Sequence, residues 1–272
     1  MKEIPILSRK LHEKPSVFQP ENLLREARRQ KGITELNIPE ICILDPDGDV
    51  EDYVIQKLNA QLNKAWACYH TKLFEFNYGD VKLGIIGKSV GSSFAVLLAE
   101  QLFASGCKLL MSMTSAGQLV QPIAPPYFIL IEKAIRDEGT SYHYLPPSEY
   151  SFLKRELKEK LEGAFDGLDL KVLTGATWTT DAPYRETEEA IIYYKGKGIH
   201  AVEMEASALY AFAEARNRPV ICFAHVTNQM ASISGDFEKG EQNGSIDALE
   251  VLFTAINQFI RRPSIVFKSN AQ

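Results

Sequence analysis

Hydrophobic positions along the chain follow two spacings, one typical of strands and one typical of helices. Short apolar or alternating runs predict strands at residues 41–44, 72–78, 81–86, 108–111 and 219–228. Apolar residues at helical spacing predict helices at residues 51–62, 92–103 and 201–215. Because strands and helices alternate, the pattern predicts a layered α/β fold with a largely parallel or mixed central sheet.

The helix predicted over residues 201–215 carries two carboxylates at its start. Glu203 and Glu205 lie before or within its first turn, where the helix dipole favours negative charge. Exposure at the surface would explain them by this effect alone. However, Val202 and Met204 bracket them, and burying an unpaired carboxylate is costly enough to imply a partner. Since one carboxylate can accept hydrogen bonds from two vicinal hydroxyls, the pattern favours a polyol ligand at Glu205.

Composition excludes several classes of protein. The chain is 45% hydrophobic and 24% charged, with a net charge of -5, which gives no electrostatic reason to expect nucleic acid as a partner. It contains no apolar run near the roughly 20 residues of a membrane span and no signal-peptide core, so we expect a cytoplasmic protein without a membrane partner. The four cysteines show neither metal-ligand nor disulfide spacing. We expect reduced core thiols and no metal at Cys42, Cys68, Cys107 and Cys222.

Residues 202–206 (VEMEA), followed after a helix by the strand-like residues 219–228, resemble the signature of the purine and uridine phosphorylase superfamily of nucleoside-cleaving enzymes. Residues 84–91 and 106–117 are similar to two early strands of that family and their glycine-containing loops. The resemblance covers about residues 41–260. It implies a single-domain three-layer α/β/α sandwich with a mixed, twisted central sheet, and a homo-oligomer (dimer, trimer or hexamer). We expect an N-terminal arm at 1–38, the catalytic domain at 39–265 and a C-terminal tail at 266–272.

The same resemblance implies a site. Glu205, which would bind the ribose hydroxyls, and Asn228, which would hold the leaving base, are the two expected catalytic residues. Further substrate-binding positions are Glu203, Met204, Thr114, Ser115, Gly117, Trp178, Tyr184 and Thr227. Phosphate-binding positions are Lys88, Ser112, Ser115, Arg185 and His70. Residues 113–117 and 178–187 are expected to be loops. His225 is interpreted as a core histidine, although its place before Thr227 allows it to face the site.

Three departures from the family pattern keep alternatives open. Residues 45–50 are acidic where bacterial relatives usually carry a phosphate-binding arginine, and Ser112 holds the place of a second arginine. Lys88, Arg185 and either His70 or Lys72 would have to compensate, although lysine does not reproduce bidentate arginine contacts well. Asn228 stands where purine-cleaving relatives often carry an aspartate, which weakens the case for adenosine-type substrates and leaves 6-oxopurine or pyrimidine nucleosides open. We expect a nucleoside phosphorylase with phosphate as co-substrate and no cofactor; a nucleoside hydrolase and a non-catalytic nucleoside-binding protein are the alternatives.

Overall fold

The structure is a computed structural model that describes residues 4–120, 123–230 and 236–260. The helices are α1 (Pro20–Lys31), α2 (Asp49–Lys57), α3 (Ser92–Ala104), α4 (Arg155–Leu161), α5 (Glu188–Gly196), α6 (Ala206–Ala215) and α7 (Ser245–Asn257). Three short 3-10 turns are η1 (Ser141–His143), η2 (Pro183–Arg185) and η3 (Glu241–Gly244). The strands are β1 (Ile41–Asp45), β2 (Gln61–Leu62), β3 (Phe74–Tyr78), β4 (Val81–Gly87), β5 (Leu109–Gln118), β6 (Tyr127–Asp137), β7 (Tyr150–Phe152), β8 (Val172–Thr180), β9 (Ala201–Glu203) and β10 (Val220–Asn228).

All the strands of the described residues belong to one mixed sheet that partly closes on itself. β1 lies parallel between β4 and β5, and the hairpin partner β3 continues the sheet beyond β4 to β2. On the other side, β5 pairs with both β9 and β10, and β10, β6, β8 and β9 pair in that order. Five strands therefore form a ring. β1, β4, β3 and β2 extend from it as an open sheet, and β7 pairs with β6 of the ring.

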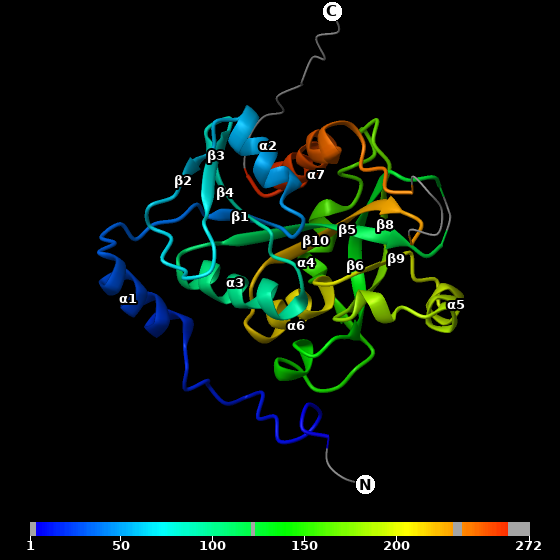
Figure 1. The fold of residues 1–272 in the computed structure, drawn as a ribbon, viewed down its shortest axis with the longest axis horizontal. Coiled ribbons are helices and arrows are strands. Elements are labelled where there is room, and N and C mark those ends of the chain that lie inside the picture. Colours follow the sequence, from blue (N-terminus) through cyan, green and yellow to red (C-terminus); the bar gives the residue numbers. More distant parts are fainter. Residues whose placement is uncertain (1–3, 121–122, 231–235, 261–272) are drawn as a thin grey trace, which may run out of the picture.

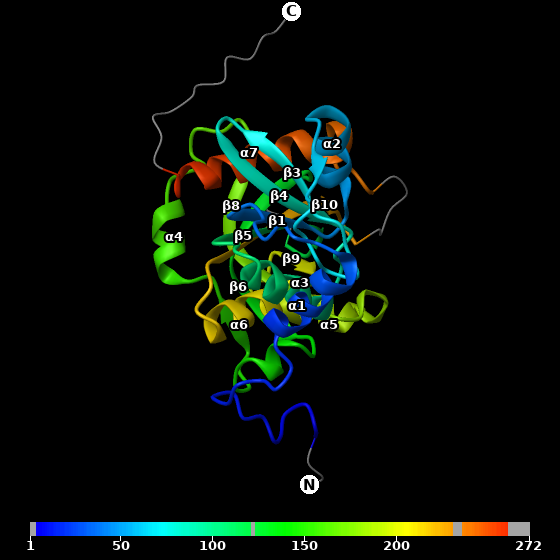
Figure 2. The ribbon, with the colours of Figure 1, turned by 90° about the vertical axis from the view of Figure 1, so that its left-hand side faces the viewer.

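Helices cover both faces of the open part of the sheet. α3 and α6 pack on each other on one side, with α1 against α3, while α2 and α7 lie together on the opposite side (Figures 1 and 2). The predicted three-layer α/β/α arrangement with a mixed central sheet is confirmed. The core between the layers is apolar, with strand residues such as Ile43, Ile85 and Phe223 fully buried.

Several element boundaries differ from those that the sequence predicted. β5 does not end at Met111 but runs through the expected loop at 113–117, because β10 pairs with it as far as Gly117. Residues 178–180, expected to begin a loop, are instead the end of β8. Residues 201–203 form a strand ahead of α6, and α2 ends at Lys57 rather than at residue 62, with Asn59 in a left-handed conformation.

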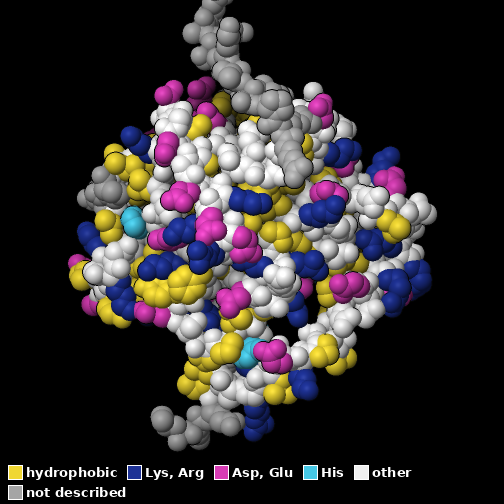
Figure 3. Space-filling view, turned by 180° about the vertical axis from the view of Figure 1, so that it is seen from behind, with side chains coloured by type: hydrophobic (Ala, Val, Ile, Leu, Met, Phe, Trp, Pro, Cys, Tyr) yellow, Lys and Arg dark blue, Asp and Glu magenta, His cyan; other side chains and the backbone are white. Residues whose placement is uncertain are grey.

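The surface and the cysteines agree with the composition. All four cysteines are buried and free, as predicted. Lys, Arg, Asp and Glu side chains intermingle on the face shown in Figure 3, without a large area of one sign. Among the described residues, the helices are too short or too polar to cross a membrane.

Candidate functional site

Glu205 lies at the junction of β9 and α6 and is only 1% exposed. Its Oε1 accepts a hydrogen bond from the backbone N–H of Gly91 at 2.6 Å, and its Oε2 accepts one from the Thr114 hydroxyl at 2.8 Å. Burial, together with the neighbouring Glu203 carboxylate, raises the pKa of Glu205 to about 8. The structure therefore gathers the start of α3, the middle of β5 and the start of α6 around one carboxylate.

The Glu203 carboxylate accepts four hydrogen bonds from neighbouring backbone and side-chain groups. Its Oε2 accepts hydrogen bonds from the backbone N–H groups of Glu205 and Ala206, both at 2.7 Å. Its Oε1 accepts from the hydroxyls of Thr177 at 3.0 Å and Thr179 at 2.5 Å. Burial raises the pKa of Glu203, and these four hydrogen bonds oppose that shift. Glu203 thus fixes the turn that presents Glu205.

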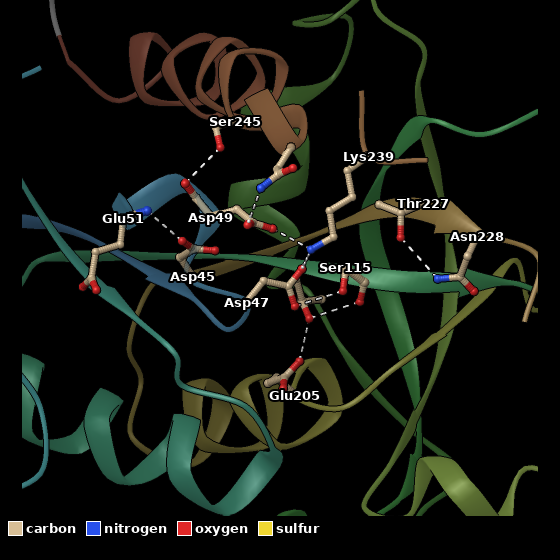
Figure 4. A network of polar contacts seen from close by, with 12 residues as sticks. Asp45, Asp47, Asp49, Glu51, Ser115, Glu205, Thr227, Asn228, Lys239 and Ser245 are labelled. Atoms are coloured by element: carbon tan, nitrogen blue, oxygen red, sulfur yellow. Dashed lines mark hydrogen bonds and ion pairs between the residues drawn. The ribbon is translucent and has the colours of Figure 1, made fainter. Parts of the chain in front are cut away.

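A second polar cluster joins the loop after β1 to Lys239, and we call residues 45–49 the acidic loop (Figure 4). The Lys239 Nζ lies 2.9 Å from Asp47 Oδ2 and 2.5 Å from Asp49 Oδ2. The Ser115 hydroxyl donates to Asp47 Oδ1 at 3.0 Å, and the Asn243 side-chain amide donates to Asp49 Oδ1 at 3.0 Å. The serine predicted to hold phosphate therefore faces a carboxylate.

The acidic loop and Glu205 belong to the same site. Thr114, which donates to Glu205, also lines a small cavity beside the acidic loop. Burial raises the pKa of Asp45 in this cavity to about 7. Burial opposes the charge of Lys239, but its hydrogen bonds with Asp49 and Asp47 raise its pKa overall. The polar residues that line the cavity are Asp45, Asp47, Asp49, Thr114, Ser115, His225, Lys239 and Asn243.

The end of β10 supplies Thr227 and Asn228. Asn228 Nδ2 donates to the Thr227 hydroxyl at 3.2 Å, and its Oδ1 accepts from the Met230 N–H at 2.9 Å. Gly117 pairs with Asn228 across the two strands. A Cβ atom at Gly117 would lie 2.5 Å from the Met230 Sδ, so a larger residue there would require the Met230 side chain to move.

The predicted aromatic and sulfur contacts lie in different environments. Trp178 is 3% exposed in an apolar cluster, with its ring 4.4 Å from that of Tyr194 and its Nε1 donating to Asp137 Oδ2 at 2.9 Å. Tyr184 is 99% exposed on η2. Met204 is half-buried beside Glu205 in the chain. Stacking of Trp178 or Tyr184 on a base, and packing of Met204 on a sugar, stay predictions.

Of the predicted phosphate ligands, Ser115 alone lines the cavity as the structure describes it. Lys88 instead forms an exposed ion pair with Asp52, with 3.4 Å between Lys88 Nζ and Asp52 Oδ1. The other positions are exposed His70, exposed Arg185 and buried Ser112. The described structure does not gather the cations that were expected to replace the family's arginines.

Sequence reasoning missed Lys239, the cation that pairs with the acidic loop. Three carboxylates within five residues indicate that a counter-charge is needed nearby. Lys239 is 192 positions away from Asp47 along the chain, so no local pattern identifies it as the partner.

Comparisons with known proteins identify the family of the chain. A model of the phosphorylase superfamily matches residues 40–260. The chain is 30% identical over 179 residues to an uncharacterised protein of Acanthamoeba polyphaga mimivirus, which covers 64% of this chain and 68% of that protein. It is 22% identical over 174 residues to guanosine phosphorylase of Halorubrum lacusprofundi, covering 64% of this chain and 69% of that enzyme.

Solved structures share the fold. A purine nucleoside phosphorylase from Toxoplasma gondii, in complex with immucillin-H, superposes with a TM-score of 0.70 at 17% identity and covers 82% of this chain and 92% of its own. A uridine phosphorylase from Vibrio fischeri superposes with a TM-score of 0.68 at 21% identity and covers 82% of this chain and 91% of its own. At these identities the likeness establishes the architecture.

Proposed function

The chain belongs to the phosphorylase superfamily, and on that premise we propose that it cleaves the N-glycosidic bond of a nucleoside by transferring the pentosyl group to water. One observation carries the choice of water over phosphate: the Ser115 hydroxyl donates to Asp47 at 3.0 Å. The family resemblance assigns this serine to phosphate. A phosphate ion would have to displace a carboxylate of like charge in order to reach it.

Glu205 is the proposed sugar-binding group. Its carboxylate is buried and already accepts two hydrogen bonds, from Gly91 and Thr114. With a pKa of about 8 the group is largely protonated at pH 7, and hydrogen bonds donated by two ribose hydroxyls would favour its ionised form, which has about four lone-pair positions. The buried setting strengthens such bonds as positive charge develops on the sugar during cleavage.

Electrostatics at the acidic loop favour a cationic sugar over an anionic acceptor. Asp47 and Asp49 share a single ammonium group, that of Lys239. A phosphate charge at 4 Å from an unneutralised carboxylate would be repelled by about 4 kcal/mol at the effective dielectric of a protein surface. The same negative charge would stabilise an oxocarbenium-like sugar.

Asn228 is the proposed contact for the base. An amide cannot protonate a leaving nitrogen, but it can both donate to and accept from a heterocycle. This chemistry suits bases that present a carbonyl beside a ring N–H. We therefore propose 6-oxopurine or pyrimidine nucleosides as the substrate class.

Phosphorolysis is the second candidate function, and Lys239 is the observation that favours it. Its ammonium group lines the same cavity as Ser115. If its hydrogen bonds turned from Asp47 and Asp49 to a phosphate ion, the cavity would hold an anion instead of repelling one.

One experiment separates these reactions. Purified protein is incubated with purine and pyrimidine nucleosides in phosphate-free and phosphate-containing buffer, and the base, pentose and pentose 1-phosphate are quantified. We expect free pentose at a rate that phosphate does not change. A rate that requires phosphate, with pentose 1-phosphate as product, would establish phosphorolysis instead. Thermal protection by a nucleoside without any cleavage would establish a binding protein.

A matched pair of variants tests the role of the acidic loop. Asp47→Asn removes the carboxylate that faces Ser115, so we expect pentose 1-phosphate to appear in phosphate buffer or to increase several-fold. Asp52→Asn is the control, because Asp52 pairs with Lys88 outside the cavity. An identical product ratio in the wild type and both variants would remove Asp47 from acceptor selection.

A further inference from the structure

The cavity beside the acidic loop is matched in size to one small molecule. It is bounded by residues of the acidic loop, β5, β10 and the start of α7, and it offers about 20 Å³ to the centre of a water-sized molecule. One water molecule needs about 10–15 Å³ measured in this way, together with two to four polar partners. The lining provides hydroxyl, carboxylate, ammonium and imidazole groups.

His225 is the lining residue whose hydrogen bonding is incomplete. It is 6% exposed, and its ring stacks on Phe128 with the centroids 4.5 Å apart. The start of α7 closes over the other side, where a Cβ atom at Gly244 would clash with the ring. The buried Nε2 has no hydrogen-bond partner among the described residues. A buried polar atom left in this way costs about 1–3 kcal/mol unless something binds it.

We infer that this cavity binds one water molecule through His225 Nε2, and that this water is the one that attacks the sugar. The second part rests on the proposed function. Burial, with the nearby Lys239 charge, lowers the pKa of His225 to about 4, so the imidazole is neutral at pH 7. A neutral imidazole can form a hydrogen bond with water and does not place a second positive charge beside Lys239. His225 is thus a positioning residue, which acts through the water.

Asp45 is the group that takes the proton of this water. Both oxygens of Asp47 and of Asp49 already accept hydrogen bonds from side chains. Asp45 instead accepts the Glu51 N–H through Oδ2 at 2.8 Å, and among the described residues its carboxylate is bonded by backbone N–H groups, those of Glu51 and Gly48, and not by side chains. The water oxygen forms a bond to the anomeric carbon, the carbon–nitrogen bond breaks, and its electron pair stays on the base. The proton passes to Asp45, and the base nitrogen takes one from solvent.

The kinetic test compares His225 with His200, a half-buried histidine outside the cavity. His225→Phe keeps the stacked ring but removes both nitrogens, so we expect kcat for pentose release to fall about 100-fold, as for other losses of positioning, with KM for the nucleoside unchanged. His225→Gln, whose side-chain amide can also hydrogen-bond to the water, should recover part of kcat. His200→Phe is the control, because His200 also has a buried ring nitrogen without a partner among the described residues but packs on Gly175 outside the cavity.

A structural test keeps this inference separate from the proposed function. A high-resolution crystal structure of the wild-type protein should show a water oxygen within about 3.2 Å of His225 Nε2. No water at that atom would overturn the inference, whatever the rates are. Wild-type kcat in a folded His225→Phe variant would also overturn it. Failure of the proposed function is a different result, in which the wild type releases pentose from none of the nucleosides, and it would overturn the assignment of the water as nucleophile.

Discussion

At the scale of single residues, Glu205 is a binding group whose ionisation lowers the stability of the folded protein. Its pKa is raised to about 8, chiefly by burial. In the unfolded chain the same group ionises near pH 4.5, so the folded state binds an additional proton between these two values. The contribution of this proton to the free energy of unfolding is fully present below pH 4.5 and is lost as the pH rises through 8. A ligand that donates hydrogen bonds to the carboxylate would offset that loss.

Glu205→Gln should therefore separate stability from function. We expect the variant to be more heat-stable than the wild type at pH 9 and similar to it at pH 5, because glutamine cannot ionise. Its transition-state stabilisation should decrease by about 2–4 kcal/mol, measured as kcat/KM for nucleoside cleavage. Melting curves of the wild type and the variant at pH 5 and pH 9 are compared with those of Glu214→Gln, a control at the exposed end of α6. Parallel melting profiles in all three proteins would contradict the raised pKa.

The site residues differ in how far sequence could predict them. Glu205, Thr114 and Ser115 lie in short segments with a distinct pattern, and the structure brings them into one site. The pairing of Asp47 with Lys239 depends on two loops that meet only after the sheet has formed. Ion pairs of this kind have no periodicity, so the sequence indicated the negative charge but not its partner.

At the scale of elements, the junction from β8 through β9 to α6 is the support for Glu205. Thr179 donates to Glu203 and accepts from the Ser207 N–H at 2.9 Å, so one hydroxyl ties β8 to the first turn of α6. Glu203 in turn accepts from the first N–H groups at that helix start, which otherwise lack partners within the helix. The geometry of the turn is thus determined by hydrogen bonds between elements.

Thr179→Val tests this support. Valine has a similar shape but leaves the buried Ser207 N–H and one Glu203 oxygen with fewer partners, so we expect a loss of about 1–3 kcal/mol in the free energy of unfolding. Urea denaturation measures it, with Thr174→Val as control because Thr174 is exposed on the same strand. Equal losses in both variants would show that the hydroxyl at 179 has no special role. The weakened turn should also reduce nucleoside affinity.

The sequence predicted the bounds of an element well where apolar residues dominate it, and less well where polar residues of the site lie within it. β4 and β10 are mostly apolar and agree closely with the predicted strands. β5 continues through Thr114 and Ser115, whose polar side chains resemble a loop. Its backbone is nevertheless paired with β10 as far as Gly117 and with β9 at Gly117 and Gln118, and pairing between distant strands is not visible in a local pattern.

At the scale of the whole molecule, the closure of five strands into a ring places the site. The β5–β10 pairing sets Ser115 beside His225 and Gly117 beside Asn228. The β5–β1 pairing sets the acidic loop at the end of the neighbouring strand. Residues from the two halves of the chain therefore meet at the carboxyl ends of the parallel strands, as is usual for ligand sites in α/β sheets.

The N-terminal segment divides into a part that packs and a part that does not, and truncation should show the difference. Leu24 and Ala27 of α1 are fully buried in a cluster with Ala67, whereas Leu11 and Val17 are 73% and 100% exposed. Removing residues 1–18 should thus change the free energy of unfolding by less than about 1 kcal/mol, because the described part of this segment is held mainly by exposed polar interactions. Leu24→Ala should cost about 2–5 kcal/mol, because it leaves a cavity between α1 and α3. Urea denaturation of both proteins measures the two values. A truncation as costly as Leu24→Ala would contradict this and show that the residues before α1 contribute to the stability of the fold. If they do so through an interface with a second copy of the chain, the melting temperature of the full-length protein should depend on its concentration.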